Sequence, residues 1–115
     1  MEESTLNMSH RVVITGMGIY SCIGKNKEEV LQSLFEGKSG IGIAPDRKEM
    51  GYRSSLCGIL EKPNLKGLLD RRQRLCLPEH GQYAFLATTE ALAQAGIDNE
   101  YLLNNEVGIL YGNDS

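Results

Sequence analysis

Residues 11–24 read RVVITGMGIYSCIG, and this stretch decides the fold. Its apolar triplet, Val12, Val13 and Ile14, is followed at once by Gly16 and Gly18. A short continuous apolar run that ends at glycines is typical of a strand buried on both faces, so we expect a strand over residues 11–17. A turn over residues 18–24 then leads directly into a helix.

The helix expected at residues 27–36 has clear boundaries. Asn26 can cap its first turn, and Glu29 stands three residues later, as in a capping box. Gly37 can take the left-handed conformation that ends a helix. One apolar face is expected at helical spacing, formed by Val30, Leu31, Leu34 and Phe35.

The middle of the chain has weaker signals. Glycines, Pro45, Pro63 and mixed charges indicate a long surface loop over residues 39–66, with a short strand at residues 55–60. A loop of this length is uncommon unless it covers something or contacts a partner. Residues 67–77 are expected to form a short helix or a turn.

A second clear helix is expected from Pro78 and Glu79 to about residue 95, ending at Gly96. It carries a stripe of small residues that would let it lie close to a neighbour and be buried: Ala84, Ala87, Ala91 and Ala95. Asp98 can cap a short helical turn through residue 103. Residues 107–111 (VGILY) then predict a second buried strand. The order strand, helix, loop, helix, strand indicates a layered α/β protein.

Composition excludes several classes of function. The chain has 115 residues, 41% of them hydrophobic and 23% charged, which suits one soluble domain at most. Its net charge of −3, without basic and aromatic residues interleaved, gives no support for nucleic-acid or anionic-membrane partners. No apolar run approaches the roughly 18 residues of a bilayer span. Residues 1–10 are expected to be a flexible leader unlike a targeting peptide, so the cytoplasm is the expected location.

Cysteines and histidines do not form a recognisable metal or cofactor site. Cys22, Cys57 and Cys76 are odd in number and far apart, and neither His10 nor His80 stands at metal-ligand spacing. Cys22 is the thiol in a strand-to-helix turn, but Asn26 rather than Cys22 is the expected cap. The favoured interpretation is three free thiols in a reducing compartment.

Two further patterns in the sequence bear on ligand binding. The turn at Gly16 and Gly18 resembles the start of a dinucleotide-binding loop, but Ser21 stands where the third glycine belongs and the helix begins too late. Arginines form the second pattern: Arg71, Arg72 and Arg74 follow Asp70. These side chains could bind phosphate or a carboxylate-rich partner. The alternative is a solvated face partly offset by Asp70.

With these features in place, the chain resembles the β-ketoacyl-[acyl carrier protein] synthases, most closely the type I elongating synthases. Residues 11–24 are similar to the N-terminal signature of these condensing enzymes. Further similar stretches follow in the same order, namely EEVLQSLFEGKSGI at 28–41, GLLDRR at 67–72, QYAFLATTEALAQAGI at 82–97 and NNEVGILYG at 104–112.

The resemblance implies an α/β fold, the incomplete N-terminal half of a thiolase-like layered α/β/α/β/α structure, with residues 11–115 as part of that domain. It implies a homodimer that condenses malonyl-carrier with an acyl thioester in fatty acid or related biosynthesis. The nucleophilic cysteine and two histidines of the family lie further along than this chain extends. We therefore expect no catalytic residue, no cofactor and no activity in this chain alone.

The resemblance also implies docking of acyl carrier protein, because the family places basic residues after an aspartate to contact the acidic helix of the carrier. Arg71 and Arg72 match those positions. Arg74 is offset by one residue from the further family arginine, which falls at Leu75, and this offset is a rotation of about 100° on a helix. The alternative function is a stand-alone carrier-binding module or an inactive partner subunit.

Overall fold

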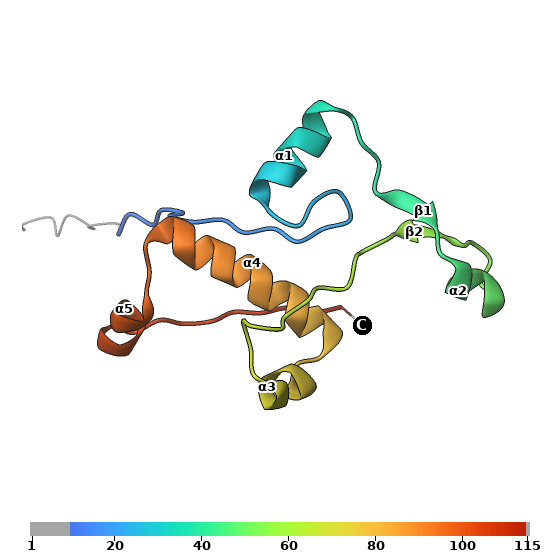
Figure 1. Ribbon diagram of the computed structural model, residues 1–115. Helices are drawn as coiled ribbons and strands as arrows, with labels where there is room; N and C mark the ends of the chain where they lie inside the picture. Colours follow the sequence, from blue (N-terminus) through green and yellow to red (C-terminus); the bar gives the residue numbers. More distant parts are fainter. Residues whose placement is uncertain (1–9, 115) are drawn as a thin grey trace, which may run out of the picture.

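The computed structural model describes residues 10–114 as a central helix flanked by extended segments, with a separate hairpin arm (Figure 1). The central helix is α4, Glu79–Ala95, and it ends at Gly96 with φ 69°. The start expected at Pro78 and the stop expected at Gly96 are both confirmed. The expected leader, residues 1–10, lies outside the described residues apart from His10.

Helix α1, Lys27–Phe35, forms where the capping residues predict it. Asn26 Oδ1 accepts from Glu29 N–H at 2.9 Å, while the Glu29 carboxylate accepts from Lys25 N–H at 2.8 Å. At the other end Gly37 has φ 66°, and Lys38 N–H donates to the Ser33 carbonyl at 2.8 Å. These contacts satisfy backbone groups that a helix end otherwise leaves without partners.

The expected apolar face of α1 is only partly buried. Val30 is buried, whereas Leu31, Leu34 and Phe35 are exposed. The helix period was therefore right, but among the described residues nothing covers the outer part of that face.

Residues 39–66 contain more structure than expected. Strand β1 is Ile41–Ile43, helix α2 is Pro45–Glu49 and strand β2 is Leu56–Gly58. The two strands pair antiparallel, with Gly42 opposite Cys57, and form an arm that projects from the rest of the chain (Figure 1). The short strand expected at residues 55–60 is confirmed as β2, while β1 and α2 were missed. Pro45 at the first helical position was the signal for α2.

Two short helices complete the described elements. Helix α3, Arg71–Cys76, follows Asp70, and helix α5, Asn99–Asn104, follows Asp98. Both aspartates cap the helix that follows, since Asp70 accepts from Gln73 N–H and Asp98 accepts from Tyr101 N–H, each at 2.8 Å. The short helix and the capped turn expected in these regions are confirmed.

The two strands expected at residues 11–17 and 107–111 are not formed. Within the described residues the only sheet is the β1–β2 pair, and both segments run beside α4 without a strand partner. Val12, Ile14 and Ile109 are 93%, 91% and 88% exposed. The apolar pattern predicted burial and extension, but a strand also needs a neighbouring strand, which the pattern does not contain.

The chain is open rather than compact. Its radius of gyration is 19.8 Å, against about 13 Å for a compact domain of this length. Its accessible surface is 10273 Å², against about 6,200 Å² for a folded monomer of this mass. The buried residues are few, namely Val30, Ser33, Ala44 and Leu65. Contrary to expectation, α4 has no buried residue, although its alanine stripe does admit a close neighbour.

Candidate functional site

The N-terminal segment lies directly on the alanine stripe of α4. A Cβ added at Gly18 would stand 1.8 Å from the Ala87 carbonyl oxygen, and one added at Gly16 would stand 2.1 Å from that of Ala91. Only a residue without a side chain allows such close approach. The expectation that small residues bring a neighbour close to this helix is confirmed.

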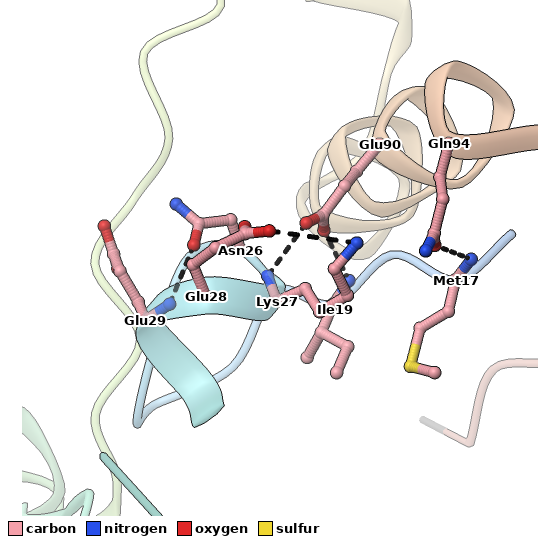
Figure 2. A network of polar contacts seen from close by, with 8 residues as sticks. All are labelled: Met17, Ile19, Asn26, Lys27, Glu28, Glu29, Glu90 and Gln94. Atoms are coloured by element: carbon pink, nitrogen blue, oxygen red, sulfur yellow. Dashed lines mark hydrogen bonds and ion pairs between the residues drawn. The ribbon is translucent and has the colours of Figure 1, made fainter. Parts of the chain in front are cut away.

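Side chains of α4 hold this segment by its backbone (Figure 2). Gln94 Oε1 accepts from Met17 N–H at 2.8 Å. Glu90 accepts from Ile19 N–H at 2.9 Å through Oε2 and from Lys27 N–H at 2.8 Å through Oε1. These two backbone hydrogen bonds hold the pKa of the Glu90 carboxyl below its ordinary value, since they favour the charged form.

These contacts also bear on the nucleotide interpretation of the turn at Gly16 and Gly18. The N–H groups of Met17 and Ile19, which a phosphate would need, already donate to side chains of α4. Neither N–H group is therefore free to donate to a phosphate in this structure.

The turn beyond Ile19 is anchored by aromatic and polar contacts. The Tyr20 ring stacks on the Tyr83 ring with centroids 5.3 Å apart, and Tyr20 Oη donates to the Glu61 carbonyl at 2.8 Å. Lys25 Nζ pairs with the Glu61 carboxylate at 2.6 Å. Burial, together with a hydrogen bond to Glu79, raises the pKa of Tyr83 to about 12.

The arginine face, defined here as Arg71 and Arg72, lies in the first turn of α3. Both side chains are exposed, and neither forms an ion pair with any residue in the range 10–114. Asp70, the acid that could offset them, accepts from Gln73 N–H while Asp70 N–H donates to Gln73 Oε1 at 2.9 Å. The Asp70 carboxylate therefore serves as the helix cap, and it forms no ion pair with Arg71 or Arg72 among the described residues.

Arg74 differs from the other two arginines. It is half-buried, and its Nη1 donates back to the Leu69 carbonyl. The neighbouring Leu75 is exposed. Arg74 thus points back toward its own chain, and the exposed position next to it holds an apolar side chain.

The three thiols are free, with Cys22 and Cys57 half-buried and Cys76 exposed. Cys22 lies against the arm, where a Cβ at Gly40 would meet its Sγ at 2.5 Å. His80 stacks on Tyr111 with ring centroids 6.2 Å apart. Between residues 10 and 114 there is no group of three acidic, cysteine or histidine side chains that could hold a metal ion.

The described cysteines and histidines thus do not mark a metal centre. Among the described residues there is also no helix long and apolar enough to cross a bilayer. What the geometry does define is a backbone-anchored turn on α4 and an arginine face on α3.

Comparison with known families identifies the class of protein. Residues 9–115 match the family described as "Beta-ketoacyl synthase, N-terminal domain". The match covers nearly the whole chain, so this chain belongs to the β-ketoacyl synthase family. Membership implies a thiolase-like fold, and the mixture of helices and strands agrees with that class.

Within the family, the chain is a type I-like N-terminal segment. It is 44% identical over 103 residues to 3-oxoacyl-[acyl-carrier-protein] synthase 1 of Escherichia coli K12 and 42% identical over 102 residues to that of Haemophilus influenzae, in each case over 89% of this chain and 25% of the relative. It is 28% identical over 107 residues to synthase 2 of Staphylococcus aureus, over 93% of this chain and 26% of the relative. The chain thus spans about a quarter of the length of these curated relatives.

Proposed function

We propose that this chain is the N-terminal part of a 3-oxoacyl-[acyl-carrier-protein] synthase and supplies part of the surface that docks the carrier protein. In the complete enzyme the reaction would be condensation of malonyl-carrier with an acyl thioester, carried out by a homodimer in the cytoplasm. Residues 11–115 would form part of the N-terminal domain. This chain would supply no catalytic residue, and by itself it would not condense substrate.

One observation carries the docking proposal. Arg71 and Arg72 are exposed, have no acidic partner among the described residues and occupy the first turn of α3. The helix dipole disfavours cations at that end, so local helix stability does not account for two arginines there. A forked guanidinium suits the carboxylates of an acidic partner helix.

The two exposed arginines and Arg74 have different roles in this proposal. Arg71 and Arg72 would contact the carrier, while Arg74 would hold the start of α3 through the Leu69 carbonyl. The alternative function, a stand-alone carrier-binding module, uses the same arginine face and differs only in whether the chain continues into catalytic residues.

Reversing the charge of both arginines is expected to weaken carrier binding by at least about a hundredfold, or about 2.7 kcal/mol, because two attractive contacts become repulsive. Arg71→Glu/Arg72→Glu would be titrated with acyl carrier protein by calorimetry or fluorescence anisotropy. Binding by the unmodified chain should also weaken as salt rises.

The matched control is Lys48→Glu/Arg53→Glu, which changes the net charge equally at two exposed positions of the arm. This control should keep binding within about threefold, since only distant, screened charges change. Equal loss in both double variants, or binding that ignores salt, would remove the arginine face as the docking surface.

A further inference from the structure

The Glu90 carboxylate joins three parts of the chain that are distant in sequence. One oxygen bonds Ile19 in the N-terminal segment, the other bonds Lys27 at the first position of α1, and the side chain itself belongs to α4 (Figure 2). The separations along the chain are 71 and 63 residues. A single carboxylate therefore bonds the backbone at both ends of the turn formed by residues 19–27.

This arrangement favours an ionised carboxylate over a protonated carboxyl or an amide. Two N–H donors point at one side chain, so both of its oxygens must accept. A protonated carboxyl turns one oxygen into a donor and loses a charge-assisted bond. An amide has the same limitation, because its NH₂ group would face an N–H group.

Other polar groups near Glu90 do not replace it. Lys27 is the cation that attracts the carboxylate, and the hollow beside Glu90 is also lined by Tyr20, Lys25, Glu61 and Lys62. Lys25 is already paired with Glu61. Of these groups, Glu90 is the one that bonds the backbone of both Ile19 and Lys27.

We propose that Glu90 is an acid-sensitive latch: its carboxylate fixes residues 19–27 on α4, and its protonation frees that segment while α4 stays helical. Tyr20 and Lys25 of this segment line two hollows, the one beside Glu90 and one beside α1. The latch therefore sets the position of the residues that these hollows share. The proposal rests on hydrogen-bond geometry and is independent of carrier binding.

The direction of the pH effect follows from the lowered pKa of Glu90. A carboxyl whose pKa is lower in the folded chain stabilises the fold at pH values above its ordinary pKa of 4.5. This stabilisation is lost as the pH falls through the pKa of the folded chain. The latch is therefore closed at neutral pH and opens in acid.

Hydrogen–deuterium exchange of the full chain tests the latch, read as protection factors for the amides of Ile19 and Lys27. As the pH falls from about 6 to about 3 we expect these factors to fall, while central α4 amides keep theirs. Glu90→Gln should show low protection at Ile19 and Lys27 at both pH values. Glu100→Gln, on the exposed surface of α5, is the matched control and should behave like the unmodified chain.

Gln94→Ala separates the latch from general loosening of the segment. It removes the contact to Met17 and leaves Glu90 in place, so Lys27 should stay protected. If Glu90→Gln fails to fold, the proposal is tested by the pH dependence of Ile19 and Lys27 protection in the unmodified chain. Loss of α4 protection together with Ile19 and Lys27, or an acid-dependent loss that persists in Glu90→Gln, would overturn the proposal.

Discussion

Gly18→Ala is expected to detach the N-terminal segment from α4 and lower protection of the Ile19 amide about a hundredfold, equivalent to about 2.7 kcal/mol. The added methyl would stand 1.8 Å from the Ala87 carbonyl oxygen and 2.7 Å from its carbon. Both are backbone atoms of a helix, so neither can move aside as a flexible side chain could. The segment must therefore lift away, and the contacts to Gln94 and Glu90 are then lost.

The control is Gly108→Ala, at a glycine whose added Cβ would meet nothing within 4 Å. This variant makes the same glycine-to-alanine change and should alter the free energy of unfolding by no more than about 0.5 kcal/mol. Hydrogen exchange and urea unfolding would be measured for both variants. Similar behaviour of the two would mean that residues 16–19 do not lie on the alanine stripe.

The second large expected effect is self-association of the 115-residue chain. Its accessible surface exceeds that of a compact monomer by about 4,000 Å². Extended apolar segments at Val12, Ile14 and Ile109 are exposed and have no strand partner among the described residues. Unpaired extended segments of this kind template pairing with another chain.

Analytical ultracentrifugation at about 50 µM should therefore show species larger than the 12.7 kDa monomer, together with a broad, low-temperature unfolding transition. Val12→Lys/Ile109→Lys should shift the distribution toward monomer, because lysines on an exposed edge oppose pairing. The matched control is Lys38→Arg/Lys48→Arg, which leaves the apolar segments intact. A monodisperse monomer with a sharp, high-temperature melt would contradict this expectation.

Helix positions could be predicted from the sequence because their boundaries depend on neighbouring residues. Asn26, Asp70 and Asp98 cap the helices that follow them, and Gly37 and Gly96 end helices with left-handed backbone. Each of these signals acts over three or four positions. A start signal and a stop signal together therefore indicate a helix between them.

Strands and burial could not be predicted in the same way. Ile14 and Ile109 have the composition of buried strands, yet both remain exposed because pairing and cover depend on residues far away in sequence. The β1–β2 pair was also only half anticipated. Strand β1, with Ile41 and Ile43 on either side of a glycine, is too short to be distinguished from a loop by its sequence.

In the candidate site, too, features set by neighbouring residues could be predicted and features set by distant residues could not. The positions of Arg71 and Arg72 at the start of a short helix follow from local pattern, and resemblance suggested their role. The return of Arg74 to the Leu69 carbonyl depends on the turn before α3, which the pattern did not define. Glu90 was missed altogether, because a lone acid on an alanine-rich helix carries no sign that two distant N–H groups point at it.

Determining the coding sequence beyond Ser115 is the most direct test of the claim that this chain is the N-terminal part of a condensing enzyme. We predict an in-frame continuation that contains a cysteine at a strand-to-helix turn followed by two histidines, the groups that the resemblance implies for acyl transfer and decarboxylation. A stop codon directly after Ser115 would contradict the catalytic assignment and leave carrier binding through Arg71 and Arg72 as the function to pursue.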